Sequence, residues 1–300
     1  MTRLTPTIFK AYLAQRLREA AVRQQRSFEH VRQVVLMDRF LGRVFATLGE
    51  DAVLRGSRAV DLRIRDDRTA RDLDLAIPGE FDDVLPRLTA AGQVELGEYM
   101  RFTIAADNSA PAIAADGFKV KGHRFRVQAW LVGVAYGDPF SVDVSPPEPI
   151  VGAPDVLPGG DHLSFAGVAP APMRLLPLPS HLADGLYYFS QPQPMGTHPR
   201  VWDLPELGLL GTVGPVRAED VAKAISLTFV HRGTHNIPRT FPLVQTAWEP
   251  HLEKMLTDDK LTWRSVPELH QVVGYFLSPV LAGGGGVWHP PTWQWQPDAG

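Results

Sequence analysis

Hydrophobic and polar positions along the chain divide it into a helical start, a middle of short strands and a helical end. Residues 8–47 repeat apolar side chains at helical spacing, which predicts two helices, the second capped by Ser27 and ended by Gly49. In the middle, alternation and short apolar runs predict strands. They are expected at 52–54, 71–77, 94–105, 118–134 and 140–145, with helices at 59–65 and 80–92 and with a turn at Lys121-Gly122 that divides 118–134 into two strands.

The second half of the chain predicts a different organisation. Residues 146–179 are rich in Pro and Gly and are interpreted as a connection between domains, with a short strand near 175–176. Helical spacing then returns, with Ser180 placed to cap the first helix and a capping box at Ser265 starting the last one. The predicted fold class is α+β, with a mixed sheet and flanking helices followed by a mostly helical domain. The predicted boundaries are 1–150 for the first domain, 151–179 for the connection, 180–287 for the helical domain and 288–300 for a tail.

The tail holds Trp288, Trp293 and Trp295 between prolines. Such tryptophans can stack on nucleic-acid bases. They can equally fold back on their own domain, and the sequence leaves both possibilities open.

The residues of greatest chemical interest flank the predicted helix at 59–65. Arg55-Gly56-Ser57 precedes it, and Asp72-Leu73-Asp74 follows it on a predicted strand. Side chains alternate along a strand, so the two carboxylates share a face and can share hard cations such as Mg²⁺. A Gly-Ser turn can admit a phosphate close to the backbone. A structural explanation stays open, because Asp-x-Asp is a common way to end a strand.

A third acid, Asp143, lies on the predicted strand 140–145. A lone strand Asp is more often an edge or turn residue, so its role depends on whether this strand lies beside Asp72 and Asp74. Three carboxylates can hold two metal ions, which activate an attacking hydroxyl and neutralise a leaving pyrophosphate. We therefore predict Asp72, Asp74 and Asp143 as catalytic and metal-binding residues.

Composition narrows the setting. The absence of cysteine excludes disulfides and thiolate metal sites and suits a reducing compartment. No apolar run approaches the ~20 residues of a membrane helix, and the start of the chain does not look like a signal peptide. We therefore expect a cytoplasmic protein with no membrane partner.

Charge is unevenly distributed along the chain. Residues 1–71 contain fifteen Lys/Arg and eight Asp/Glu, a net charge of +7, so the remainder carries −10 within the total of −3. A basic first part beside the predicted site can attract nucleic acid or nucleotide. A solvated, arginine-rich helix face is the simpler explanation.

The stretch from Arg55-Gly56-Ser57 through Arg68-Thr69 to Asp72-Leu73-Asp74 resembles the nucleotidyltransferase toxins of the AbiEii/AbiGii superfamily, which includes the MenT-type toxins. Asp143 falls where that family carries its third strand carboxylate. The segments 200–207 and 231–238 are also similar in outline to family elements. The likeness covers most of the chain at low identity and is strongest at 54–77.

The resemblance implies a polymerase β-like nucleotidyltransferase fold and the activity of a toxin from a toxin–antitoxin or phage-defence pair. It implies transfer of a nucleotide from an NTP to RNA, at the 3′ end of tRNA, with two Mg²⁺ ions or Mn²⁺ in their place. The implied partners are tRNA or another RNA and a cognate antitoxin. The implied nucleotide-binding residues are Arg55, Gly56, Ser57, Arg68, Arg71, Arg200, Asp203 and Glu206.

The sequence departs from the family at two cations. The family's lysine before the Gly turn is Arg55, and the lysine of the later helix aligns with Gly185. Lys223, Arg200 or Arg232 could take over its role. Gly185 therefore leaves open a catalytically weakened relative that binds RNA or a partner. Transfer to a protein or to a small molecule such as an aminoglycoside is a third possibility, although the arginine surplus argues against a cationic substrate.

Overall fold

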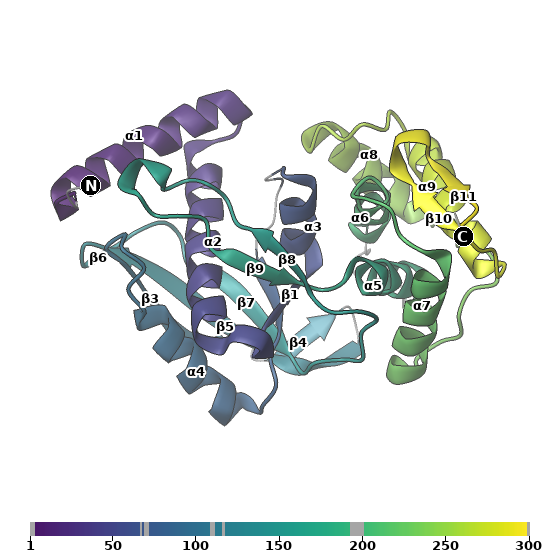
Figure 1. Ribbon diagram of the computed structural model, residues 1–300, viewed down its shortest axis with the longest axis horizontal. Helices are drawn as coiled ribbons and strands as arrows, with labels where there is room; N and C mark the ends of the chain where they lie inside the picture. The colour runs from purple at the N-terminus through teal and green to yellow at the C-terminus, as the bar shows by residue number, and fades with distance from the viewer. Residues whose placement is uncertain are drawn as a thin grey trace.

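A computed structural model describes residues 4–66, 68, 72–108, 112–115, 118–192 and 201–298. The sheet and its helices form one half of the molecule and a helical bundle the other, and Figure 1 shows α3 (Gly56–Ile64) at their junction. The α+β class is as predicted. Within the described ranges, every helix is too short or too polar to span a membrane.

The chain starts with two helices, as the apolar periodicity predicts. They are α1 (Pro6–Gln24) and α2 (Phe28–Leu48), and α2 begins where Ser27 Oγ accepts a hydrogen bond from the backbone N–H of His30. Gly49 is the C-cap of α2. α1 packs on α2, which in turn packs on the sheet.

Most strands of the described chain join one mixed sheet, in the order β3-β5-β7-β2-β1-β9-β8. β2 pairs in parallel with β7, and β1 with β9, while the other pairs are antiparallel. Two short strands, β4 and β6, pair with β5 outside this path. The bounds are β1 (Val53–Arg55), β2 (Asp72–Ala76), β3 (Met100–Ala106), β4 (Ala112–Ala115), β5 (Phe118–Leu131), β6 (Val134–Ala135), β7 (Phe140–Ser145), β8 (Asp155–Pro158) and β9 (Pro172–Leu175).

Three local predictions differ from the structure. β5 is one continuous strand rather than two divided at Lys121-Gly122, because β4 pairs with it on both sides of that point, at Lys119 and at His123. The strand expected from residue 94 begins only at Met100. The expected connection 151–179 contributes β8 and β9 to the edge of the sheet. The division of the chain at 150 and 180 remains our proposal.

α2 and α4 (Phe81–Gln93) cover one face of the sheet, and the main core lies between these helices and the sheet. Leu73 and Leu75 of β2 and Val142 and Val144 of β7 point into this core, where they cluster with Phe40 of α2. Alternation along a strand therefore turns the polar residues of β2 and β7 to the opposite face.

The helical half has its own core, to which α3 contributes Val60. Its helices are α5 (Leu178–Ser190), α6 (Asp203–Leu210), α7 (Ala218–Arg232), α8 (Glu249–Asp258) and α9 (Val266–Leu281). α5 starts two residues before the predicted cap, and Ser180 Oγ instead accepts the N–H of Val151 at 3.0 Å. Ser265 caps α9 as predicted.

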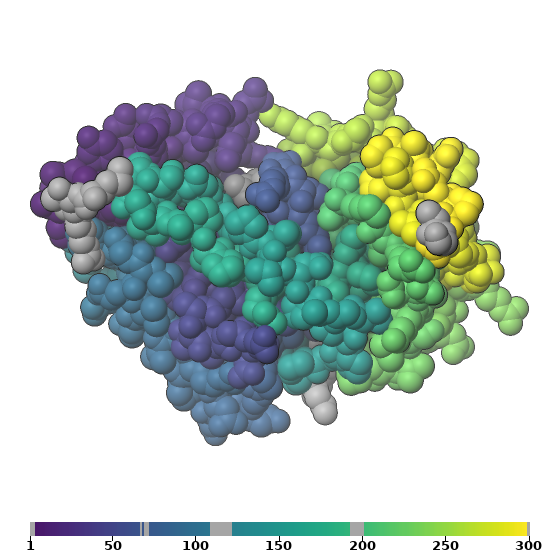
Figure 2. Space-filling model, viewed as in Figure 1, coloured from purple at the N-terminus to yellow at the C-terminus, as the bar shows by residue number. Residues whose placement is uncertain are grey.

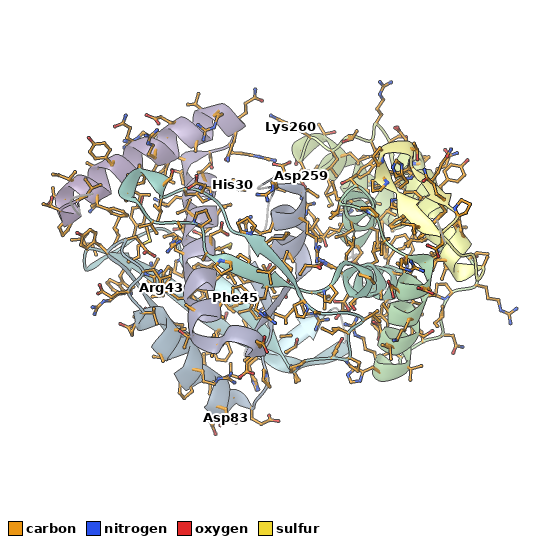
Figure 3. The ribbon with its side chains drawn as sticks, viewed as in Figure 1. His30, Arg43, Phe45, Asp83, Asp259 and Lys260 are labelled. Carbon is orange, nitrogen blue, oxygen red and sulfur yellow. The ribbon has the colours of Figure 1, made fainter. Side chains whose placement is uncertain are left out.

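The two halves of the molecule also meet at a second place, away from α3. Lys260, beyond α8, donates a hydrogen bond to Gln25 Oε1 at the α1–α2 turn, and Figure 3 shows Lys260 beside that end of the sheet half. Figure 2 shows the same face in space-filling form, with the segment that carries β8 and β9 spread over the sheet half.

The tryptophan tail folds back on its own domain. It forms a hairpin of β10 (Val287–His289) and β11 (Gln294–Gln296) against α9. All three indole N–H groups donate to backbone carbonyls, those of Gly211, Val272 and Phe276. The rings pack on one another and on Phe276, so the structure favours an internal role over base stacking.

Candidate active site

The strand register places the two acid-bearing strands side by side. β2 and β7 are parallel neighbours in which Asp74 lies directly opposite Asp143, and Asp72 opposite Ser141. The strand that carries Asp143 therefore lies beside Asp72 and Asp74, as a shared role of the three acids requires. Asp72, Asp74 and Asp143 share the face of the sheet opposite the main core.

The row of charged residues continues over both neighbouring strands. Arg55 of β1 is the register partner of Asp74, and Arg124 of β5 is the partner of Asp143. The row across four strands thus reads arginine, aspartate, aspartate, arginine. Arg124 donates two hydrogen bonds of 2.7 Å to Asp143, from Nε and from a terminal nitrogen.

Asp74 is electrostatically unfavourable in its ionised form. Burial, followed by the charges of Asp72 and Asp143, raises the pKa of Asp74 to about 7, and Arg55 only partly offsets this. A carboxylate crowded by others gains from a nearby cation. This environment suits a divalent ion.

Gly56 is required by both conformation and space. Its φ is +63°, and a Cβ built on it would collide with the carboxylate of Asp74. The first residue of α3 therefore touches the acid, and a side chain there would displace either the turn or Asp74. α3 starts at Gly56, and the first backbone N–H groups of a helix lack partners within it and favour a nearby anionic group.

Ser57 is engaged by the helical half. Its hydroxyl donates to Glu206 Oε1 of α6 at 2.5 Å, and Arg68 lies 3.8 Å from the same oxygen. Arg68 in turn donates to Asp61 of α3 at 2.8 Å. Asp203 lies one turn before Glu206 on α6 and is buried. The predicted phosphate-binding residues thus link α3 to α6 in this structure.

A second charged cluster adjoins the acid row. Arg55 and Arg232 of α7 both bind Asp184 of α5, at 2.7 and 2.5 Å, and Glu148 accepts from both arginines. Arg55 also donates to Ser145, two residues beyond Asp143. Burial opposes ionisation of Asp184, yet Arg232 and Arg55 hold its pKa below the usual value. A cavity of about 50 Å³ adjoins the cluster.

Two predicted residues, Arg71 and Arg200, lie outside the described residues. The sequence analysis did not identify three residues that the structure places at the site: Arg124, Asp184 and Glu148. Arg124 carried the best signal, because it alternates with core residues on the strand before Asp143. Of the three proposed substitutes for the family lysine, Arg232 is bound to carboxylates and Lys223 is exposed on α7.

Gly185 serves helix packing in this structure. A Cβ there would come within 2.8 Å of Leu207 Cδ2, so the small residue allows α5 and α6 to approach closely. The position therefore faces a neighbouring helix, where a lysine would not fit without moving it.

We expect Gly185→Lys to destabilise the protein by about 1–3 kcal/mol through overpacking. We also expect it not to tighten nucleotide binding. Urea unfolding and titration calorimetry with an NTP measure the two effects. Gly214→Lys is the control, because nothing lies within 4 Å of a Cβ at Gly214. A stable variant with tighter NTP binding would show instead that position 185 opens to the nucleotide.

The donor chemistry suits Mg²⁺ or Mn²⁺, since the three acids offer only oxygen ligands. Within the described ranges, no group of three or more His, Cys, Asp or Glu side chains is arranged so that it could hold a metal ion. Arg124 donates to both carboxylate oxygens of Asp143. Asp72 and Asp74 would hold a metal from one strand, and Asp143 would join them by releasing Arg124.

A comparison with family models and a comparison with solved structures both give matches. A family model described as nucleotidyl transferase AbiEii toxin, type IV TA system, matches residues 39–272. The structure of MenT4, a nucleotidyltransferase toxin of Mycobacterium tuberculosis H37Rv, superimposes with a TM-score of 0.53 at 13% identity, covering 93% of this chain and 99% of that one. JHP933 of Helicobacter pylori gives a TM-score of 0.46 at 17% identity over 85% and 91% of the two chains. Comparison of the sequence with curated proteins gives no significant match.

The family model spans well over half of the sequence, and MenT4 shares the fold. The chain belongs to the AbiEii nucleotidyltransferase toxin family of type IV toxin–antitoxin systems.

Proposed function

We propose that this protein is a Mg²⁺-dependent toxin that transfers a nucleotide from an NTP to the 3′ end of RNA, with tRNA as the preferred acceptor. The observation that carries the proposal is the register that places Asp143 beside Asp74, with the Gly56 turn against Asp74. The toxin would act in the cytoplasm and be silenced by a cognate antitoxin.

The residues suggest a division of labour. The start of α3, with Arg55, Gly56 and Ser57, would receive the triphosphate, and Ser57 would leave Glu206 to do so. Bound divalent ions would neutralise the triphosphate and lower the pKa of the attacking hydroxyl. Asp143, on the far side of the row, would orient that hydroxyl and accept its proton. The new bond joins the 3′ oxygen to the α-phosphorus, and the bond to the β-phosphate breaks, releasing pyrophosphate.

Total RNA, each α-labelled NTP and Mg²⁺ provide the direct test. We expect labelling of an RNA band by the wild type and none by Asp143→Asn. Asp138→Asn is the matched control, because Asp138 is 84% exposed and lies outside the site. Equal labelling by wild type and Asp143→Asn would overturn the assignment of the acid row. RNA binding with no labelling from any NTP would favour the weakened, RNA-binding relative.

We expect divalent ions to stabilise the folded protein. At ten times its dissociation constant, Mg²⁺ would add about 1.4 kcal/mol, or about 3 °C in Tm. Differential scanning fluorimetry at pH 8, with KCl matched for ionic strength, measures this. The shift should vanish in Asp74→Asn. An unchanged wild-type Tm over millimolar Mg²⁺ would contradict a metal site at these residues.

A further inference from the structure

The β5–β3 side of the acid-bearing face is open to solvent along its outer strand, β3. β3 alternates between core and solvent: Met100 and Phe102 are buried, whereas Arg101, Thr103 and Ala105 are exposed. This alternation is typical of a sheet with one face in water. The exposed face therefore continues directly from the acid row across β5 to the edge at β3.

The side chains on this face are cationic, polar and aromatic. Along β5 they are Arg124, Arg126, Gln128 and Trp130, which alternate with the buried residues of the same strand. Arg126 is exposed, and its one hydrogen bond in the described structure is a long one of 3.5 Å to Ser141 Oγ. Its positive charge therefore faces solvent close to the acid row.

Trp130 lies across the two strands. Its indole Nε1 donates to Thr103 Oγ1 at 3.0 Å, while its register partner on β3 is Arg101. The bond fixes the ring over the sheet surface and leaves it half-buried. Arg101 at the edge is 59% exposed and pairs with Glu95. We name the surface formed by Arg124, Arg126, Gln128 and Trp130 of β5 with Arg101 and Thr103 of β3 the β5–β3 platform.

The order of the charged residues across β1, β2, β7 and β5 determines which reactant can reach the β5–β3 platform. Arg55 and the α3 turn lie on the β1 side of the acids, and Asp143 lies on the β5 side. Neighbouring strands are about 4.8 Å apart, so the platform starts about one strand beyond Asp143. A triphosphate seated at the α3 turn leaves only the β5 side free for the attacking hydroxyl.

We propose that the β5–β3 platform holds the single-stranded 3′ end of the acceptor RNA, and this rests on the function proposed above. Arg126 contacts a backbone phosphate, Trp130 stacks on an unpaired base, and the terminal hydroxyl reaches Asp143. A two-strand surface that carries one aromatic ring suits a single strand, since base stacking requires unpaired bases. Guanidiniums and polar side chains on the platform, with no large aliphatic residue, favour RNA over a protein partner.

Binding in EDTA tests the platform separately from catalysis. The probe is a fluorescein-labelled single-stranded 12-mer RNA ending in a free 3′ hydroxyl, measured by fluorescence anisotropy over a salt series. We expect Arg126→Gln to weaken binding about 3- to 10-fold and to reduce the salt slope by about one phosphate contact. We expect Trp130→Leu to weaken it about 10-fold with little change in slope. Circular dichroism confirms that each variant is folded.

Arg16→Gln is the matched control, because Arg16 is a 56% exposed arginine on α1, away from the platform. Control binding equal to the wild type, with both platform variants weakened, supports the proposal. It is overturned if Arg126→Gln and Trp130→Leu bind RNA like the wild type, or if Arg16→Gln weakens binding as much. Loss of antitoxin binding by the platform variants, with RNA affinity unchanged, also overturns it. If the wild type transfers nucleotides but both platform variants bind RNA normally, the platform proposal fails and the transferase proposal holds. If the platform variants bind RNA weakly but the wild type transfers no nucleotide, the transferase proposal fails and the platform proposal holds.

Discussion

Asp74→Asn is expected to slow nucleotide transfer by at least about 1000-fold while making the metal-free protein more stable at pH 8. The first effect follows because a neutral amide cannot replace the carboxylate that lies between Asp72 and Asp143. The second follows because the ionised Asp74 is half-buried beside the like charges of Asp72 and Asp143, and an amide of the same shape avoids that cost.

The pH dependence gives the sign of the stability effect. The pKa of Asp74 is raised from its ordinary value of 3.8 to about 7 in the folded protein by burial and by the charges of Asp72 and Asp143. The folded state therefore binds the proton more tightly, and the wild type loses stability as pH rises from about 4 to about 7. Asp74→Asn lacks this loss, so its advantage, on the order of 1–2 kcal/mol, should be present at pH 8 and absent at pH 4.

Urea unfolding in EDTA at pH 4, 6 and 8 measures this difference. Asp61 titrates in the same range, since burial raises its pKa to about 7, but it is present in both proteins and cancels. Asp138→Asn controls for loss of one exposed carboxylate. A variant that is less stable than the wild type at pH 8 would show that ionised Asp74 holds the fold together. Retained transfer would remove Asp74 from the catalytic set.

Glu98→Gln is expected to lower the free energy of unfolding by about 3 kcal/mol or more. Glu98 is fully buried and accepts hydrogen bonds from Arg39 at 2.9 Å and from Arg43 at 2.5 Å. Figure 3 shows Arg43 on α2 in the sheet half. A neutral amide leaves two buried guanidiniums without their counter-charge, which the low-dielectric core penalises. Burial already lowers the pKa of Arg43, although Glu98 opposes this.

Glu95→Gln is the matched control for this substitution. Glu95 pairs with Arg101 at 2.9 Å, but both side chains are 59% exposed. Exposed pairs contribute about 0–1 kcal/mol, so the control should unfold nearly like the wild type. Chemical denaturation of the two variants side by side measures the difference. Similar losses in both would mean that burial of the Arg39–Glu98–Arg43 triad does not determine its contribution.

Local chemistry was predictable wherever neighbours in sequence decide it. The two N-terminal helices follow from apolar spacing, and Ser27, Gly49 and Ser265 mark helix ends as expected. The face shared by Asp72 and Asp74 needs only the alternation of a strand. The division of β5 at Lys121-Gly122 was wrong, because pairing with β4 at Lys119 and His123 overrides a local turn signal.

Contacts between distant segments could not be predicted from the sequence. Asp184 reaches Arg55 and Arg232 only because α5, α7 and β1 converge. In the sequence, Gly185 stands where the family has a lysine, whereas the structure shows that Leu207 packs closely against this position. The tryptophans of the tail satisfy their N–H groups on carbonyls of α9 and of the segment after α6.

The sequence by itself determined the two N-terminal helices, the Asp72/Asp74 face and the Gly-Ser turn before it, because backbone periodicity and turn conformation are local properties. Only the tertiary structure decided that Asp143 lies opposite Asp74, that Arg124 holds Asp143 and that Ser57 meets Glu206. Strand order and domain packing bring these groups together, and both depend on burial of apolar surface summed over the whole chain.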